Sequence, residues 1–391
     1  PIDTSILDKL TKNWSSIQSH LVEAIDRDFG IYDEGVFKRD RFEAYLVRQG
    51  IPWPRLESGA LALDDDTFKS LSRAHPQLAP LRELRATLGQ MRLNSITVGE
   101  DGRNRCLMSP FRSKTGRNQP SNTRFIFGPS AWLRSLIRPP EGMAVAYCDY
   151  ARQEFGIAAV LSDDSAMKAA YRAADTYIAF GQLAGGIPEG ATRYSHPDER
   201  EKYKLVALAV QYGMTEHGLS LRGGMSRAEA RQLLRTHKRA FPDYWLWSDQ
   251  VESYGTLRRQ LRTPLGWKIR FPGGDQINLR SVRNWPVQSL GADMLRVAMI
   301  ALEDAGIEVI APVHDAVLIQ APLHEIEDAV QQTCDILRRV SGHLLGGFRL
   351  EVDAEIVGYP DRYVDGRGTA MWATVMELLP RKNGFPETDD L

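Results

Sequence analysis

The sequence predicts an α+β fold, and two observations carry that prediction. Residues 1–95 and 166–260 read as helical over most of their length, from apolar side chains that recur at three and four positions. Two apolar runs, 143–148 and 309–319, read instead as strands. One run ends at an aspartate and the other contains one, and these two acids can meet only if the runs pair as strands of one sheet.

The N-terminal region is predicted to be mainly helical. Proline at positions 52 and 54 ends the second helix, because proline cannot continue a helix and restricts the residue before it. Asp65 or Asp66 is the expected N-cap of the third. The expected helices cover 6–27, 36–49, a short segment through Leu71, and 78–93.

An arginine-rich irregular segment follows, over residues 96–127, where glycine and proline break short extended pieces. Between Arg82 and Arg138 there are eleven Arg or Lys residues against three acids. A solvated charged face usually mixes both signs, whereas an Arg-dominated excess is suited to contacts with phosphates. We expect this stretch to follow a nucleic-acid backbone, although the formal net charge of the whole chain is only -1.

The second half alternates helices with a few strands. A turn-rich hairpin is expected over 255–274, because it holds repeated glycine and proline. The 309–319 run is expected to form a strand, a turn and a strand, and residues 349–357 a final strand. The expected helices are 163–184, a helix that begins at Pro197, 227–240, 290–305 and 323–340.

The composition limits the class of protein. At 391 residues the chain exceeds the usual size of one hydrophobic core, so two or three subdomains are expected. Its three cysteines lack metal-ligand spacing, which disfavours a disulfide framework or a zinc site. No apolar run approaches the ~20 residues that cross a bilayer, and no signal peptide opens the chain, so we expect a soluble intracellular protein. The chain begins with Pro1 rather than Met, which indicates a processed or trimmed fragment; any upstream domain would lie outside this sequence.

Asp149 and Asp315 are the first candidate site residues. Neighbouring strands would place the two carboxylates side by side, where they repel each other unless a cation lies between them. Hard divalent cations such as Mg²⁺ prefer carboxylate oxygens. The pair therefore indicates a two-metal site for phosphoryl transfer.

The helix that opens at Pro197 offers a cationic face. Arg200, Lys204 and Leu208 recur every four residues, and Gln211 or Tyr212 continues the row. Such a face can bind a triphosphate near the helix N-terminus and present apolar or aromatic surface to a base farther along. An ordinary amphipathic helix is the alternative, but its position between the two aspartate strands favours the binding face.

Two further polar residues lie near the aspartates in sequence. Glu154 follows Asp149 past the expected strand end, where a carboxylate against an aromatic side chain would crowd a sugar 2'-hydroxyl; a surface glutamate on the next helix is the alternative. His314 precedes Asp315. A lone histidine before a turn is more often structural than a metal ligand, so His314 is not expected to bind metal.

Five short segments, in this order and spacing, resemble the motifs of family A DNA polymerases, the DNA polymerase I class. The resemblance extends with gaps from about Leu81 to Val357. The segments are Thr115-Gly116-Arg117, the motif A-like Asp149-Tyr150-xxx-Glu154, the motif B-like Arg200-xxx-Lys204-xxxxxxx-Tyr212-Gly213, Asn284-Trp285-Pro286-Val287-Gln288, and the motif C-like Val313-His314-Asp315.

The resemblance implies a right-hand polymerase fold with an antiparallel-sheet palm, helical fingers and a helical thumb. It implies a thumb over 1–95, palm over 96–165 with the TGR segment and motif A, fingers over 166–283 with the motif B helix, and palm over 284–391 with motif C and the last strand. The implied reaction adds dNTPs to a primer 3'-hydroxyl on a template and releases pyrophosphate.

The resemblance also implies residue roles. Asp149 and Asp315 would bind two Mg²⁺ ions, replaceable by Mn²⁺, with the backbone carbonyl of Tyr150 as a further ligand. Lys204 would neutralise the triphosphate and protonate the leaving pyrophosphate, and Arg200 would hold the distal phosphates. Glu154 would be the gate against ribonucleotides, near Tyr212. The implied DNA contacts are Arg117, Gln288, Asn284 and His314, of which Arg117 and Gln288 would touch the minor-groove edge of the primer terminus.

Several positions depart from the family pattern. Ala316 stands where a glutamate commonly follows the motif C aspartate. Leu208 replaces an aromatic side chain that stacks on the incoming nucleotide, which predicts weaker stacking. Tyr177 replaces a phosphate-contacting histidine, so a hydroxyl must make that contact. Arg152 and Gly156 also differ from the common motif A pattern.

Two other functions stay open. A single-subunit RNA polymerase-like enzyme shares the palm and the lysine helix but lacks an acidic gate at the Glu154 position; an inactive DNA-binding replication module is the other alternative. The first 95 residues lack an acid cluster suited to nuclease metals, so we expect no proofreading within this chain. We expect a monomer that uses primer-template DNA and dNTPs, without membrane contact, in the cytoplasm and on the nucleoid of a bacterial or phage-infected cell. Whether an upstream domain or replication partners exist outside this chain stays open.

Overall fold

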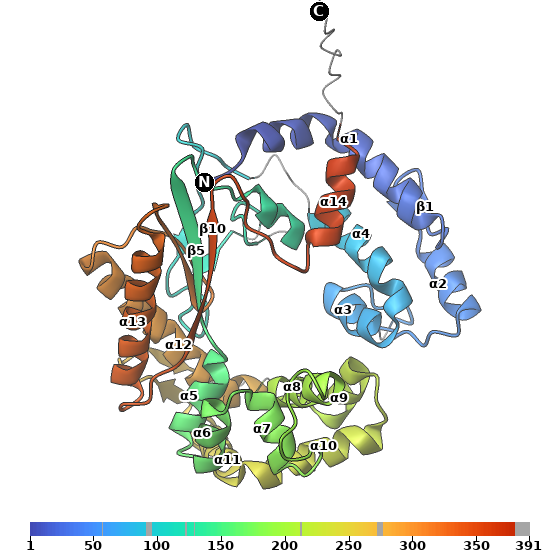
Figure 1. Ribbon diagram of the computed structural model, residues 1–391. Coiled ribbons are helices and arrows are strands. Elements are labelled where there is room, and N and C mark those ends of the chain that lie inside the picture. Colours follow the sequence, from blue (N-terminus) through green and yellow to red (C-terminus); the bar gives the residue numbers. More distant parts are fainter. Residues whose placement is uncertain are drawn as a thin grey trace, which may run out of the picture. The chain divides into compact units, whose positions relative to one another are not determined.

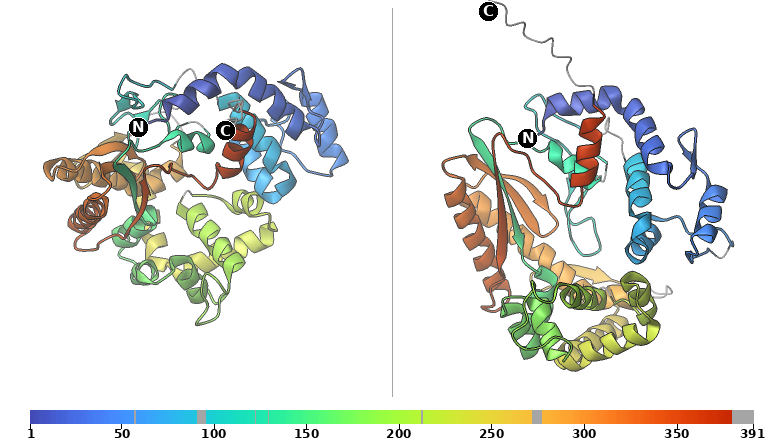
Figure 2. Two further views of the ribbon diagram at one scale, coloured as in Figure 1. Left: turned by 45° about the horizontal axis from the view of Figure 1, so that its top comes forward. Right: turned by 45° about the vertical axis from the view of Figure 1, so that its right-hand side comes forward.

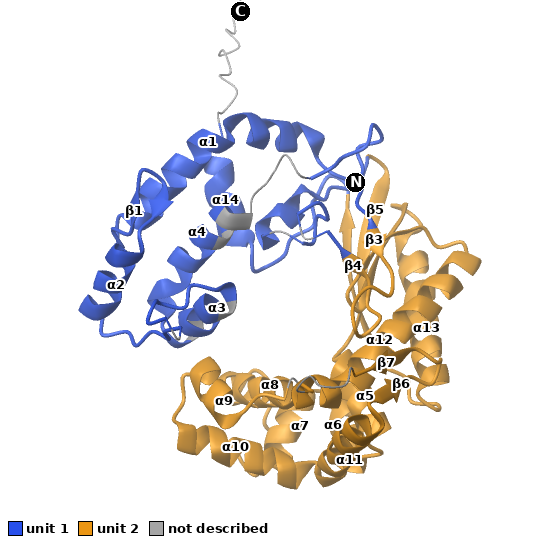
Figure 3. Cartoon of the chain, turned by 180° about the vertical axis from the view of Figure 1, so that it is seen from behind, with its two compact units in different colours: residues 1–107, 120–140, 359–391 blue, residues 108–119, 141–358 orange. Residues whose placement is uncertain are grey.

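The chain divides into two compact units, each built from separate stretches of sequence. The computed structural model describes residues 1–56, 58–90, 96–121, 123–128, 130–211, 213–271 and 277–379. Unit 1 comprises residues 1–107, 120–140 and 359–391, and unit 2 comprises 108–119 and 141–358 (Figure 3).

Unit 1 is mainly helical, as the sequence predicts for its N-terminal part. An aromatic cluster of Phe42, Trp53 and Phe68 packs its smaller helices together, with ring centroids 4.9 to 5.4 Å apart. Its helices are α1 (Thr4–Asp26), α2 (Arg39–Arg48), α3 (Asp65–Ala74), α4 (Ala79–Gln90) and α14 (Thr369–Glu377), with the 3-10 helices η1 (Pro76–Leu78) and η3 (Ala131–Leu136) and the short strands β1 (Tyr32–Asp33) and β2 (Val36–Phe37).

One expectation for this unit is wrong, and another extends beyond the described residues. The N-cap of α3 is Asp64, whose carboxylate accepts a hydrogen bond from the Thr67 amide at 2.8 Å, so the prediction of Asp65 or Asp66 is wrong. All three aspartates satisfy the capping preference, and their order alone could not separate them. The C-terminal end of the expected 78–93 helix lies outside the described residues beyond Gln90.

A four-stranded antiparallel sheet forms the centre of unit 2, with the order β10-β5-β9-β8. The strands are β5 (Met143–Tyr150), β8 (Val309–Val313), β9 (Ala316–Pro322) and β10 (Val352–Gly358). Helices α12 (Leu279–Asp304) and α13 (Ile326–Leu344) pack against the sheet and against each other (Figure 1). The pairing of β5 with β9 joins the two predicted aspartate strands directly.

The helical insertion between β5 and β8 is confirmed. Ala144, Ala146 and Cys148 of β5 belong to the same buried core as the helices of this insertion. Figure 2 shows these helices grouped beyond one end of the sheet. They are α5 (Gln153–Leu161), α6 (Ser165–Arg172), α7 (Thr176–Leu183), α8 (Pro197–Gln211), α9 (Glu216–Gly223), α10 (Arg227–Ala240) and α11 (Pro242–Arg258), followed by the hairpin strands β6 (Gln260–Arg262) and β7 (Lys268–Arg270).

Two predicted helices of unit 2 have different bounds. The 163–184 helix is broken into α6 and α7, because the Asp175 carboxylate accepts the amides of Tyr177 and Ile178 and starts a new helix. The 290–305 helix begins at Leu279 and carries Pro286 inside it. Buried side chains before and after the proline, including Val282 and Leu290, pack this helix on both sides of the missing hydrogen bond, which offsets the usual cost of an internal proline.

The arginine-rich 96–127 segment contains the two-residue strands β3 (Met108–Ser109) and β4 (Gln119–Pro120) and otherwise turns and bends, as expected. In the described part of the chain, no helix is long and apolar enough to cross a membrane.

Candidate active site

The two predicted aspartates come together at one end of the sheet. Asp149 pairs with Ala316 in the β5–β9 register, and Asp315 lies next to Ala316 in the turn between β8 and β9. The amide of Tyr150 donates a hydrogen bond to the carbonyl oxygen of Asp315, at 3.5 Å. This short connection is possible because His314 takes a left-handed conformation with φ of 56° and turns the chain sharply.

The electrostatics of the pair fit a cation. Burial, together with the negative charges of the nearby Asp315 and Asp353 carboxylates, raises the pKa of Asp149 to about 7. Burial also raises the pKa of Asp315, although the positive charge of Arg117 opposes that shift. One carboxylate oxygen of Asp149, Oδ1, is buried and lacks a hydrogen-bond partner in the described part of the chain. A divalent cation would satisfy this oxygen and remove the repulsion between the carboxylates.

The protein alone supplies a small set of metal ligands here. No group of three or more His, Cys, Asp or Glu side chains among the described residues is arranged to hold a metal ion. Tyr150 has a buried side chain whose hydroxyl donates to the Leu337 carbonyl at 2.8 Å, so only its backbone is available as a ligand. Two carboxylates and a backbone carbonyl leave several positions of an octahedral Mg²⁺ ion for water and phosphate oxygens.

Arg117 and Glu154 form an ion pair beside the aspartates. The Arg117 guanidinium donates from Nη2 to Glu154 Oε1 at 2.9 Å, and their side chains are 25% and 13% exposed. Glu154 lies in the first turn of α5, directly after β5. The predicted gate and a predicted DNA contact therefore touch each other, which the sequence did not indicate.

The loop that carries Arg117 is fixed to α12. Gly116 has φ of +77°, and a Cβ there would lie 3.0 Å from the indole nitrogen of Trp267, so this position needs glycine. Arg296 donates to the Gly116 carbonyl at 2.6 Å, and Trp285 donates to the Lys114 carbonyl at 2.7 Å. These contacts explain why a glycine precedes the arginine.

Helix α8 presents the predicted cationic face. Arg200 and Lys204 are partly exposed and Leu208 is exposed, whereas Tyr203, Val206 and Val210 are buried on the other side of the helix. Both cations contact Glu201, at 2.6 Å from Arg200 and 3.4 Å from Lys204. Gln211 is buried and does not extend the face, and Tyr212 lies outside the described residues.

Tyr177 lies close to this face. Its ring centroid is 5.4 Å from the guanidinium carbon of Arg200, and Arg200 also donates to the Asp175 carboxylate at 2.7 Å. Burial raises the pKa of Tyr177 above the ordinary phenol value, so the hydroxyl stays neutral near pH 7. It can donate one hydrogen bond but brings no charge.

The remaining predicted DNA contacts lie on two elements of unit 2. Asn284 and Gln288 are half-buried and one helical turn apart on α12, so they lie on one side of that helix. His314 is exposed in the β8–β9 turn, and its charge favours the ionised form of Asp315.

Sequence reasoning missed several residues at the site. Asp175 is the N-cap of α7 and binds Arg200, and its signal was an aspartate before a helical run. Asp353 lies opposite Asp149 in the β10–β5 register, which only the strand pairing reveals. Arg152 appeared as a departure from the motif, without an assigned role.

Comparisons with known proteins agree with the motif order. The model of "DNA polymerase family A" matches residues 113–357. DNA polymerase I of Chloroflexus aurantiacus is 25% identical over 310 residues, which is 73% of this chain and 32% of that protein. The thermostable DNA polymerase I of Thermus aquaticus is 25% identical over 329 residues, 77% of this chain and 39% of that protein. The chain thus spans about a third of the length of these curated relatives.

A solved structure shows the same fold. The polymerase domain of Pol1 from M. smegmatis, in complex with DNA primer-template and dNTP, has a TM-score of 0.73 over 95% of this chain and 68% of that chain, at 22% identity. The predicted α+β polymerase fold is therefore confirmed. The family match covers both aspartate strands, the α8 helix and the Arg117 loop, and the chain belongs to DNA polymerase family A.

Proposed function

We propose that this chain is a template-directed DNA polymerase that adds dNTPs to a primer 3'-hydroxyl and releases pyrophosphate. The observation that carries the proposal is the Asp149–Asp315 pair, with its raised pKa and its unpartnered carboxylate oxygen, at the end of the sheet. Family membership and the cationic face of α8 support it.

The metal requirement is part of the proposal. Asp149, Asp315 and the backbone carbonyl of Tyr150 would hold two Mg²⁺ ions, with Mn²⁺ able to substitute. When bound, the ions would make the primer hydroxyl more acidic and stabilise charge on the reacting phosphate.

The side chains around the pair would bind and orient the substrates. Lys204 would neutralise the triphosphate and protonate the leaving pyrophosphate, while Arg200 would hold the distal phosphates. Glu154 would exclude a 2'-hydroxyl, next to Tyr212, and Tyr177 would offer its hydroxyl to a phosphate. Leu208 would lie against the incoming nucleotide.

The DNA would lie across α12 and the Arg117 loop. Arg117, Gln288, Asn284 and His314 are the proposed contacts to the primer-template. We assign the thumb to 1–95, the palm to 96–165 and 284–391, and the fingers to 166–283. The protein would act as a monomer on the DNA of the nucleoid, in the cytoplasm. Any upstream domain or replication partner would lie outside this chain.

Primer extension tests the reaction. With Mg²⁺ and all four dNTPs, the wild-type chain should extend a primer on its template, and Asp149→Asn should lower the rate by at least about 1,000-fold. Asp163→Asn, which changes an exposed aspartate of unit 2, should extend like the wild type.

The same assay separates the alternatives. Predominant use of ribonucleotides would point to an RNA polymerase-like enzyme. DNA binding without extension by the wild type, or equal extension by Asp149→Asn, would point to an inactive DNA-binding module. We propose no proofreading within this chain. A primer with a mispaired 3' end should therefore keep its length, and no mononucleotide should be released from it.

A further inference from the structure

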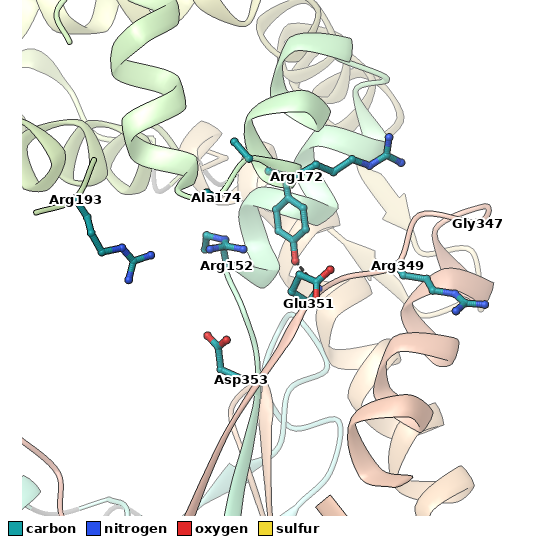
Figure 4. Close-up of a pocket in the computed structure, with 10 residues that line it drawn as sticks. Arg152, Arg172, Ala174, Arg193, Gly347, Arg349, Glu351 and Asp353 are labelled. Atoms are coloured by element: carbon teal, nitrogen blue, oxygen red, sulfur yellow. Dashed lines mark hydrogen bonds between the residues drawn. The ribbon is translucent and has the colours of Figure 1, made fainter. Parts of the chain in front are cut away.

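A pocket of about 710 Å³ in unit 2 lies where β5 and β10 end, beside α6 and the segment that precedes α8. Its lining includes four arginines, with Asp353 and Glu351 as the acids. Figure 4 shows Arg152, Arg193 and Asp353 pointing to one side of the β10 strand, while Arg172 and Arg349 point to the other side. Asp353, on the first side, lies opposite Asp149 in the β10–β5 register.

Arg152 is held in an unfavourable backbone conformation. It lies between β5 and α5 with φ of 52°, which a side chain larger than glycine rarely adopts and which recurs at functional sites. Tyr171 holds the local chain, because its hydroxyl donates to the Ala151 carbonyl and accepts the Glu351 amide, both at 2.9 Å. The Arg152 guanidinium lies 5.1 Å from the Tyr171 ring centroid.

The charge of Arg152 is not neutralised by a carboxylate of the described residues. No carboxylate in the described ranges forms an ion pair with it, and its buried Nε has no hydrogen-bond partner there. A buried donor without a partner costs free energy that a bound anion would recover. The side chain is thus prepared for a negatively charged ligand.

Arg193 and Arg200 share one acid close by. Both contact Oδ2 of Asp175, at 3.1 Å and 2.7 Å. Arg200 also lies over the Tyr177 ring, and the charge of Arg152 acts on the same phenol. Arg152 and Arg200 therefore act on Tyr177, and Arg193 joins Arg200 on Asp175. The carboxylates paired with these three guanidinium groups are Asp175 and Glu201, which leaves an excess of positive charge.

Carboxylates and arginines both line this pocket. Asp149 and its β10 neighbour Asp353 lie on the same face of the sheet, because residues directly opposite in an antiparallel pair point to one side. Arg152 and Arg193 line the same pocket as Asp353 and lie on its side of β10 (Figure 4). A metal-bound polyphosphate would use both kinds of group, with its metal end toward carboxylates and its distal phosphates toward guanidinium groups.

We propose that Arg152 and Arg193 bind the polyphosphate of the incoming nucleotide, in addition to Arg200 and Lys204. The proposal rests on the proposed polymerase function and extends it to two residues outside the motif pattern. It gives a physical reason for a tyrosine at position 177. The neutral hydroxyl of Tyr177 brings no positive charge to the phosphates. Arg152 and Arg193 supply that positive charge instead.

The test compares three matched variants, Arg152→Gln, Arg193→Gln and Arg172→Gln. Arg172 lines the same pocket but points away from the Asp353 side (Figure 4). Arg152→Gln and Arg193→Gln should each raise KM for dNTP on the order of tenfold, with kcat and the Kd for primer-template near the wild-type values. Arg172→Gln should match the wild type in all three. Circular dichroism and thermal unfolding establish that each variant is folded.

A binding measurement without turnover separates this inference from the polymerase function. Isothermal titration calorimetry of inorganic tripolyphosphate with Mg²⁺ should show about tenfold weaker binding for Arg152→Gln and Arg193→Gln, but not for Arg172→Gln. If these two variants bind tripolyphosphate more weakly but the wild-type protein fails to extend primers, the phosphate site is supported and the polymerase function is refuted. Active polymerase with tripolyphosphate affinity unchanged in Arg152→Gln and Arg193→Gln would overturn the phosphate site and leave the polymerase intact.

Discussion

At the residue scale, the Arg117–Glu154 ion pair links the expected gate to the expected DNA contact. The carboxylate is only 13% exposed and is held at 2.9 Å from the guanidinium, so its position does not depend on bound nucleotide. A fixed side chain excludes a substrate hydroxyl better than a mobile one, because it cannot move aside without losing the ion pair.

Replacing Glu154 should therefore relax sugar selection. Glu154→Ala opens space for a 2'-hydroxyl, and the preference for dNTP over rNTP, measured as a ratio of kcat/KM values, should fall on the order of 100-fold. Glu154→Gln keeps the volume and should retain most of the preference. Equal loss in both variants would show that the charge, rather than the size, selects the sugar.

Asp149 should couple metal binding to pH. Its pKa is raised to about 7, so without metal the fold favours the protonated carboxyl, and this contribution to stability is lost as pH rises from about 4 through 7. A divalent cation needs the ionised form. Mg²⁺ at ten times its Kd should add about 1.4 kcal/mol to the unfolding free energy at pH 8, and far less at pH 5.

Denaturant titrations with and without Mg²⁺ measure this difference. In Asp149→Asn the stabilisation at pH 8 should largely disappear, while Asp163→Asn, at an exposed position, keeps it. Stabilisation by Mg²⁺ that is equal at pH 5 and pH 8 would contradict the assignment of Asp149 as a metal ligand.

The sequence predicts the site residues that local patterns identify. It does not predict those that come together only through contacts between segments far apart in the chain. Asp149 and Asp315 follow from residue type and position at strand ends. Asp353 lies opposite Asp149 because of the β10–β5 register, which no local pattern encodes. The Arg117–Glu154 contact likewise depends on how the Gly116 turn is held by α12.

At the element scale, α8 shows how one helix divides between core and ligand. Its exposed row of Arg200, Lys204 and Leu208 follows from four-residue spacing, and Leu208 is 37% exposed. An aliphatic side chain covers a nucleotide base but cannot stack on it as a planar aromatic ring does. Leu208→Phe should lower KM for dNTP roughly three- to tenfold through stacking, measured by steady-state primer extension.

A leucine elsewhere in unit 2 provides the control. Leu221 is exposed to a similar extent, 39%, on α9, and Leu221→Phe should leave KM unchanged. A lower KM in both variants would indicate a general effect of added apolar surface. An unchanged KM in Leu208→Phe would remove Leu208 from the nucleotide contact.

The packing of α10 and α11 predicts sensitivity to acid. His237 is buried among aromatic rings, and Trp245 contacts its Nδ1 at 3.1 Å. Burial lowers the pKa of His237 to about 3, so the folded state keeps it neutral while the unfolded state binds a proton below about pH 6.5. The stability that this neutral histidine allows is present above pH 6.5 and is lost as pH falls toward 3.

His237→Gln should reduce that loss. Between pH 7 and pH 5 the wild type should lose about 2 kcal/mol more unfolding free energy than His237→Gln, measured by urea denaturation. The exposed His217 on α9 gives the control, and His217→Gln should follow the wild-type pH dependence. Parallel curves for the wild type and His237→Gln would contradict a neutral buried histidine.

Helix prediction succeeded where local signals agree and failed where packing decides. The bounds of α10 match the predicted 227–240, since the Ser226 hydroxyl oxygen accepts a hydrogen bond from the Glu229 amide at its start and the helix has distinct polar and apolar faces. The start of α12 was missed because Pro286 indicates a boundary locally, while burial on both sides keeps the helix continuous. Helix α14 was not predicted at all.

At the scale of the whole molecule, the compact units do not follow sequence order. Unit 1 takes its residues from three separate stretches, including the C-terminal one. The motif order predicts palm residues for 284–391, and that assignment stays a prediction. Within unit 1, the ring centroids of Trp372 in α14 and Trp132 in η3 lie 6.1 Å apart. Arg362, which precedes α14, donates to Asp3, the N-cap of α1, at 3.2 Å, so the C-terminal stretch contacts two earlier parts of the unit.

Removing the C-terminal stretch should therefore loosen unit 1 and spare unit 2. In a chain that ends at Gly358, amides of α1 and η3 should exchange hydrogen on the order of 100-fold faster, because the tryptophan packing and the ion pair of Arg134 with Asp365 are lost. Amides of β5 and α13 should keep their protection, since their contacts lie within unit 2. A chain that ends at Leu379 is the matched control, and Trp372→Ala in the full chain should reproduce part of the effect. Unchanged exchange in α1 after truncation at Gly358 would mean that the helices of 1–107 form a core of their own, and loss of protection in β5 would mean that the two units unfold as one.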